Sequence, residues 1–95
     1  MNRYETLFVL IPTLDEEGVK ANIEKFKGVI EQGGTVSNID EWGKRRLAYE
    51  INDIGEGFYI LINFKANPDL PKELDRIFRI SDAVLRHIII NLDEK

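Results

Sequence analysis

The sequence predicts an α+β domain with its elements in the order β-α-β-β-α-β. Four segments rich in β-branched and aromatic residues are typical of strands, two segments carry apolar residues at helical spacing, and turn-forming residues separate them. In this order the four strands form one antiparallel sheet with both helices on one face. Ninety-five residues, 43% of them hydrophobic, support one core, so we expect a single domain over residues 1–95.

The first strand is predicted at residues 4–11, an aromatic and β-branched run that stops at Pro12. Its even-numbered members share one face, while Leu7 and Val9 on the other face are apolar as well. Apolar residues on both faces indicate a central strand that is at least partly covered on each side.

The first helix is predicted from about residue 15 to 32. Thr13 begins a segment that fits a capping box, and the acidic residues 15–17 suit the positive end of a helix dipole. Apolar residues then follow at helical spacing, namely Val19, Ile23, Phe26 and Ile30. Gly33 and Gly34 are expected to end the helix in the left-handed conformation.

A long hairpin is predicted next. Residues 35–51 form an edge strand in which Gly43 suggests a bulge, residues 52–57 form the turn, and residues 58–65 alternate as the third strand. The second helix opens within residues 67–71, with prolines in its first turn, and ends near Ile80. The fourth strand covers residues 84–92.

The face of the sheet away from the helices, the open face, is expected to carry apolar side chains. By alternation Leu7, Val9, Leu61 and Ile89 fall there, beside Tyr59. Such a face is normally polar where nothing binds, so an apolar patch indicates a protein partner. The candidate partner-binding residues are Leu7, Val9, Tyr59 and Leu61.

Composition and the N-terminus bear on the compartment. The chain has no cysteine, so a disulfide or thiolate metal site is excluded. Its start lacks the cationic and apolar pattern of an export signal, and no apolar stretch approaches the roughly 20 residues that cross a bilayer. We therefore expect a cytoplasmic protein with no membrane association.

No catalytic constellation is apparent in the sequence. His87 is the single histidine and has no nucleophilic cysteine or serine motif to serve. The glycines at 55 and 57 lack the full dinucleotide-binding pattern. The sequence predicts no enzyme activity, no metal site, no cofactor and no small-molecule substrate.

Three adjacent cations, Lys44, Arg45 and Arg46, lie between Trp42 and Tyr49 on the predicted edge strand. Cations neutralise phosphates and aromatic rings stack on bases, so this segment is suited to RNA, although the net charge of the chain is −4. A solvated basic edge that blocks sheet-to-sheet aggregation explains the same residues equally well.

Alternation places Trp42, Lys44 and Arg46 on one face of the edge strand, unless a bulge at Gly43 breaks the register. Two further cations, Arg3 and Arg86, lie on the first and fourth strands, which are adjacent in this fold, and would extend the cationic surface. Ion pairs of these two arginines are an equally good interpretation, and the candidate acidic partners are Glu5 and Asp82.

Three segments of the sequence match the pattern of one known family: residues 3–5, residues 43–51, and residues 79–82 with Arg86. The middle segment, Gly-Lys-Arg-Arg-Leu-Ala-Tyr-Glu-Ile, is highly specific. Over essentially its whole length the chain resembles the bacterial small-subunit ribosomal protein S6 family. The resemblance implies a ferredoxin-like fold, no enzymatic activity, binding to the central domain of small-subunit ribosomal RNA, and a heterodimer with ribosomal protein S18. The RNA contacts that it implies are Arg3, Lys44, Arg45, Arg46 and Arg86.

An alternative is a single-stranded RNA-binding module like the RNA recognition motif, which shares this topology. Such modules begin the relevant segment of their third strand with a lysine or arginine, where this chain has Glu56. The inner stacking positions here are aliphatic, so the sequence fits this class poorly.

Overall fold

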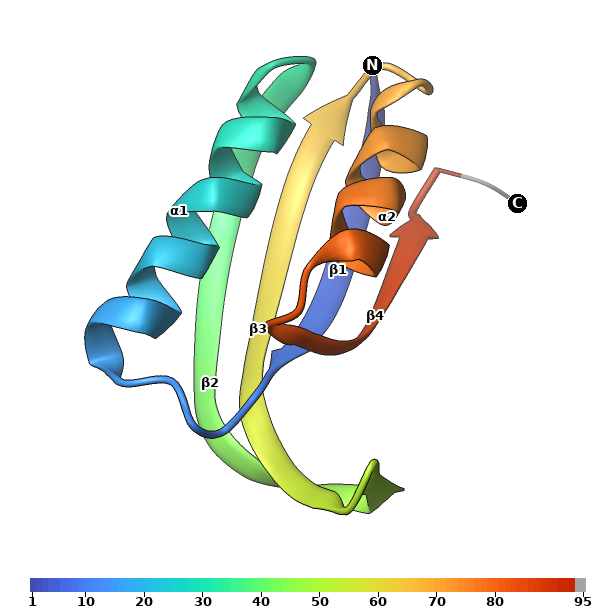
Figure 1. Ribbon diagram of the computed structural model, residues 1–95. Coiled ribbons are helices and arrows are strands. Elements are labelled where there is room, and N and C mark those ends of the chain that lie inside the picture. Colours follow the sequence, from blue (N-terminus) through green and yellow to red (C-terminus); the bar gives the residue numbers. More distant parts are fainter. Residues whose placement is uncertain (94–95) are drawn as a thin grey trace.

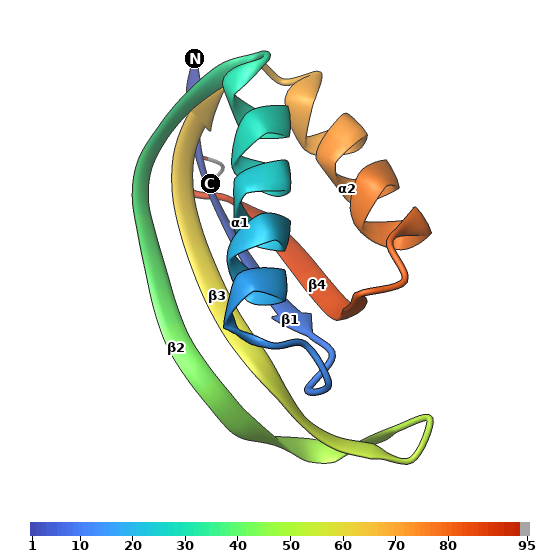
Figure 2. The same ribbon diagram turned by 60° about the vertical axis from the view of Figure 1, so that its left-hand side comes forward.

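A computed structural model describes residues 1–93 and contains the six elements in the predicted order. The three strand pairings are all antiparallel, with the order β2-β3-β1-β4 in the sheet. Both helices cover the same face of the sheet (Figures 1 and 2). The predicted α+β, ferredoxin-like fold is therefore confirmed. The elements are β1 (Asn2–Leu10), α1 (Glu16–Glu31), β2 (Gly34–Ile51), β3 (Ile54–Ala66), α2 (Leu70–Ile80) and β4 (Val84–Asn91).

The core lies between the helices and the sheet. Phe8 of β1, Phe26 of α1 and Phe78 of α2 meet at its centre, with ring centroids 4.7 to 5.2 Å apart. The buried hydroxyl of Thr6 donates a hydrogen bond of 2.7 Å to the carbonyl of Ile88, so its polar group is satisfied. Alternate residues of β1 and β3 complete this core, including Tyr4, Leu10, Ile60, Ile62 and Phe64.

Both ends of α1 differ in detail from the prediction. Asp15 is the N-cap residue, and its carboxylate accepts a 2.7 Å hydrogen bond from the backbone N–H of Gly18. The capping role expected for Thr13 is therefore wrong. The left-handed end expected at Gly33 and Gly34 is also wrong, because neither has a positive φ. Gly34 is required for space instead, since a Cβ atom there would lie 2.1 Å from a carbonyl oxygen of β3.

The hairpin between β2 and β3 is longer than predicted. Its turn contains only Asn52 and Asp53, both with positive φ, as a two-residue type I′ turn requires. The predicted turn over residues 52–57 is thus wrong, and Gly55 and Gly57 belong to β3. Seen in Figure 1, the hairpin extends past β1 and β4 and bends across the end of the sheet.

Candidate functional site

A β-bulge lies next to Lys44, Arg45 and Arg46, which we call the basic segment. It occurs at Gly43, where a bulge was predicted. Glu41 pairs with Ile60 and Gly43 pairs with Tyr59, so Trp42 is the extra residue. Gly43 has a φ of 80°, in the left-handed region that glycine adopts without strain. The bulge shifts the alternation of every residue that follows it in β2.

This shift separates Trp42 from Lys44. The Trp42 ring lies nearly parallel to that of Tyr59, with centroids 6.2 Å apart, while the Lys44 ammonium lies 5.2 Å from the centroid of the Phe58 ring. Since Phe58 and Tyr59 are consecutive in a strand, they point to opposite faces. The exception allowed for a bulge at Gly43 therefore applies, and Trp42 and Lys44 do not share a face.

The three cations of the basic segment, Lys44, Arg45 and Arg46, are all exposed. Within residues 1–93 none of the three forms an ion pair. The Arg45 guanidinium donates a 3.2 Å hydrogen bond from Nε to the carbonyl of Trp42, which leaves its other donors to solvent. Three adjacent exposed cations that form no ion pair among the described residues favour an anionic ligand.

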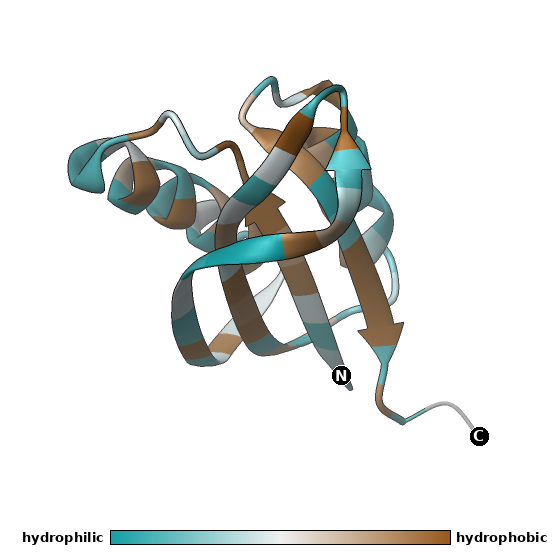
Figure 3. Ribbon diagram, turned by 90° about the horizontal axis from the view of Figure 1, so that it is seen from below, coloured by the Kyte–Doolittle hydropathy of each residue, from teal (hydrophilic) through white to brown (hydrophobic). Residues whose placement is uncertain are grey.

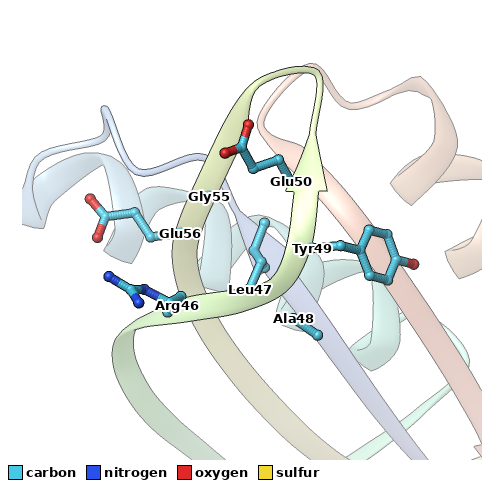
Figure 4. A pocket seen from close by; sticks show the side chains of 7 residues that line it. All are labelled: Arg46, Leu47, Ala48, Tyr49, Glu50, Gly55 and Glu56. Atoms are coloured by element: carbon cyan, nitrogen blue, oxygen red, sulfur yellow. The ribbon is translucent and has the colours of Figure 1, made fainter.

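A hollow of about 650 Å³ lies beside this segment (Figure 4). Arg46 borders it together with the carboxylates of Glu50 and Glu56. These two negative charges offset the cation, so the hollow is poorly suited to a phosphate, and the exposed strand is the better candidate surface. In the part of the chain that the structure describes, no cluster of three or more His, Cys, Asp or Glu residues is arranged to hold a metal ion.

Arg86 contacts β2, the strand that carries the basic segment, although it lies on the opposite edge of the sheet. It lies on β4, yet its Nη1 donates a 3.1 Å hydrogen bond to the Tyr49 hydroxyl of β2, and its guanidinium lies 5.4 Å from the centroid of that ring. The curled hairpin brings these two edge strands together. The alternative interpretation, an ion pair of Arg86 with Asp82, does not hold among the described residues.

Arg3 lies near the start of β1, whereas Arg86 pairs with Val9 near the end of that strand. Its backbone N–H and its guanidinium both bind the carboxylate of Asp93, at 2.7 Å from the backbone nitrogen and 2.8 Å from Nη2. The backbone N–H, followed by the guanidinium, lowers the pKa of Asp93 below its ordinary value. The partner of Arg3 is thus Asp93, not Glu5.

The separation of Arg3 from Arg86 follows from the register of the sheet. Arg86 pairs with Val9, which is six positions from Arg3, so the two arginines are roughly 20 Å apart along β1. The expectation that Arg3 and Arg86 extend a single surface is wrong. Arg86 joins the basic segment, and Arg3 does not.

The open face carries a row of apolar side chains across three strands. Leu7 pairs with Leu61 of β3 and with Ile88 of β4, and Ile90 lies two residues further along β4. Leu7 and Leu61 are half-buried, whereas Ile88 and Ile90 are 46% and 44% exposed. Apolar residues along β4 are also evident in Figure 3.

Two of the residues expected on this face are covered. Ile89 pairs with Thr6 and packs against the core, so its expected place on the open face is wrong. Val9 is on the open face but is 2% exposed, because the curled hairpin lies against it at Gly57. Tyr59 is half-buried beside it, with its ring facing Trp42.

Sequence reasoning missed Ile88 and Ile90, although one signal pointed to them. Alternation from a surface-exposed Arg86 places residues 88 and 90 on its face rather than 89. The ring of His87 confirms the alternation, because it lies on the helix side, with Nε2 2.7 Å from a carboxylate oxygen of Asp75 in α2.

Taken together, the fold and these surfaces define a small ferredoxin-like domain with an exposed basic segment and an apolar open face. The family model for ribosomal protein S6 matches residues 3–91. The chain therefore belongs to the ribosomal protein S6 family and is a protein of the small ribosomal subunit, in the cytoplasm. No helix among the described residues meets the length and hydropathy that a membrane span requires.

Individual relatives agree with this assignment. The chain is 71% identical over 92 residues to small ribosomal subunit protein bS6 of Clostridium beijerinckii, covering 96% of this chain and 97% of the relative. It is 66% identical over 96 residues to the protein of the same name from Clostridium kluyveri, covering both in full. Among solved structures, the 30S ribosomal protein S6 of Thermotoga maritima superposes with a TM-score of 0.90 at 28% identity, covering 95% of this chain and 86% of that one.

Proposed function

We propose that the chain is a structural component of the small ribosomal subunit, without enzymatic activity, that binds the central domain of the ribosomal RNA together with ribosomal protein S18. The observation that carries the RNA contact is the basic segment. Lys44, Arg45 and Arg46 are adjacent, exposed and without ion pairs within residues 1–93. In a chain with a net charge of −4, such grouping is what an approach to a polyanion requires.

The proposed RNA surface contains the basic segment and Arg86. The contact of Arg86 with Tyr49 places this fourth cation beside β2. Arg3 is assigned to a separate and weaker contact, because its guanidinium must exchange the carboxylate of Asp93 for a phosphate. Its side chain is 62% exposed, which leaves it accessible to RNA at that end of the sheet.

The proposed surface for S18 is the open face. Leu7 and Leu61 provide its centre, Tyr59 lies to one side, and the more exposed Ile88 and Ile90 extend it to the edge of β4. Exposed apolar side chains in neighbouring positions are typical of protein interfaces. Val9 contributes as a buried support for its neighbours rather than as a contact.

The experiment is a titration of a central-domain RNA fragment with this chain, with S18, and with both proteins, by filter binding at fixed salt. We expect tight binding only with both proteins, since few cations on an acidic domain give weak affinity alone. Equal affinity of the isolated chain would favour the RNA recognition motif-like alternative. Failure of both proteins together to bind would refute the proposal.

A further inference from the structure

We propose that Tyr49 is a positioning residue that holds Arg86 in place to bind a phosphate of the RNA. This inference rests on the proposed function, since it names how one cation of the RNA surface is organised. The ligand is a phosphodiester group next to the basic segment. Tyr49 itself makes no phosphate contact.

The contact geometry supports a positioning role. The Tyr49 hydroxyl accepts from Nη1 of Arg86 at 3.1 Å, and the ring lies 5.4 Å from the guanidinium carbon. A guanidinium has five N–H donors, and within residues 1–93 only one of those of Arg86 is used. The remaining donors match the two oxygens of a phosphate, which arginine binds in bidentate fashion.

The fold constrains the part of the hairpin that carries Tyr49. Leu47, two residues earlier in β2, is 6% exposed and anchors this part of the strand. On β3, Gly57 allows close contact with β1, because any Cβ atom there would lie 2.5 Å from Val9. Tyr49 is nevertheless 62% exposed, so the pair it forms with Arg86 faces solvent.

The position of the pair suits a shared ligand. Tyr49 follows Arg46 by three residues, which span at most about 10 Å because the pairing of β2 with β3 is irregular between Arg46 and Ile51. Arg86, held against Tyr49, thus lies within reach of the same stretch of RNA as the basic segment. A flexible arginine on a separate strand loses side-chain entropy when it orders on binding, and a preformed contact lowers that cost.

A purely structural bridge between the two edges of the sheet is the competing explanation. Loss of such a bridge lowers stability but leaves the number of neutralised phosphates unchanged. The salt dependence of RNA binding separates the two, because its slope reports that number. Tyr49 carries no charge, so its replacement changes the salt slope only if Tyr49 holds the Arg86 guanidinium against a phosphate.

The test measures binding of this chain together with S18 to the central-domain RNA fragment from about 50 to 200 mM salt. The variants are Y49L, Y49F, R86Q and the double variant, with R76Q as a control that removes an exposed cation from α2. We expect R86Q and Y49L each to lower the salt slope by about 0.7 to 0.9 units, the double variant to lower it no further, and R76Q to leave it unchanged. Y49F retains the ring and should lie between wild type and Y49L.

The outcomes separate this inference from the proposed function. If R86Q lowers the slope while Y49L does not, Tyr49 does not position Arg86 and the inference is overturned alone. The same holds if Y49L weakens binding to S18 but leaves the RNA slope intact. If wild-type protein with S18 shows no salt-dependent RNA binding, the proposed function itself is overturned.

Discussion

Gly57 of β3 lies so close to Val9 of β1 that a Cβ atom on the glycine would stand 2.5 Å from Cγ1 of the valine. The same atom would lie 2.7 Å from the carbonyl oxygen of Leu10. This contact lets the β2–β3 hairpin curl over the end of the sheet. The curled hairpin covers Val9 and brings Tyr49 into contact with Arg86.

Replacement by alanine should have opposite effects at Gly57, which is crowded, and at Gly28, which is not. Gly57→Ala should destabilise the chain by about 1–3 kcal/mol, because the crowded backbone must shift. Gly28→Ala, on the exposed side of α1 with nothing within 4 Å of the added atom, should stabilise it by about 0.5–1 kcal/mol. Urea unfolding of both variants is the measurement. A neutral Gly57→Ala variant would mean that the hairpin does not pack against β1.

Phe26 tests the packing of α1 on the sheet. Its ring is fully buried against those of Phe8 and Phe78, so Phe26→Ala should cost about 3–5 kcal/mol of unfolding free energy. Chemical denaturation of the variant and the wild type gives the difference. A reduction below about 1 kcal/mol would show that the helix packs elsewhere.

The lowered pKa of Asp93 predicts that the stability of the chain depends on pH. Because the backbone N–H of Arg3 and then its guanidinium lower the pKa of Asp93 in the folded chain, its contribution to stability is complete at neutral pH. That contribution is lost as the pH falls through the lowered folded pKa. The stability difference between wild type and Asp93→Asn should accordingly shrink in acid, as measured by denaturation at several pH values.

Arg3→Gln supplies the control for this titration. It should raise the pKa of Asp93 in a carboxyl NMR titration, but not fully to the ordinary value, since the backbone N–H of residue 3 remains. An unchanged pKa would show that the guanidinium does not contact Asp93 in solution.

Much of the fold was predictable because local patterns agreed with tertiary structure. Alternation indicated the strands and helical spacing indicated the helices, and the specific run from Gly43 to Ile51 indicated the family. The turn of the hairpin was misjudged because glycine favours turns, whereas Gly57 is needed for space against a distant strand. Such a requirement is not visible in local sequence.

The candidate site was predictable in part. The basic segment stood out as a run of like charge, but the bulge at Gly43 moved Trp42 to the face opposite Lys44. The position of Ile89 was ambiguous because three consecutive isoleucines carry no alternation. The contact between Tyr49 and Arg86 depends on hairpin curvature, which is set by tertiary packing rather than by either segment.

The open face gives a prediction about the protein partner. Leu61→Asp and Ile88→Asp should each weaken heterodimer formation with S18, because an unpaired charge would be desolvated in the interface. Ile80→Asp is the matched control, since Ile80 is 67% exposed at the end of α2, on the helix side. Calorimetric titration measures the affinities, and circular dichroism checks the fold. Unchanged affinity of both open-face variants would remove this face from the interface.

The double variant Arg45→Glu with Arg46→Glu addresses the RNA surface. It should weaken binding of this chain and S18 to the central-domain RNA, while thermal stability changes little because both side chains are exposed. The charge reversal replaces attraction to phosphate with repulsion on the strand that we propose faces the RNA. Differential scanning calorimetry of the double variant checks that the fold is retained.

The central claim, that an acidic ribosomal protein binds RNA through one basic strand, is tested most directly by the salt dependence of that binding. Filter binding of wild type and the Arg45→Glu, Arg46→Glu variant, each with S18, should give a slope lower by about 0.7 to 0.9 units for every phosphate that the variant no longer neutralises. Equal affinity and equal slope across the whole salt range would contradict the claim. The basic segment would then be only a solvated edge of the sheet.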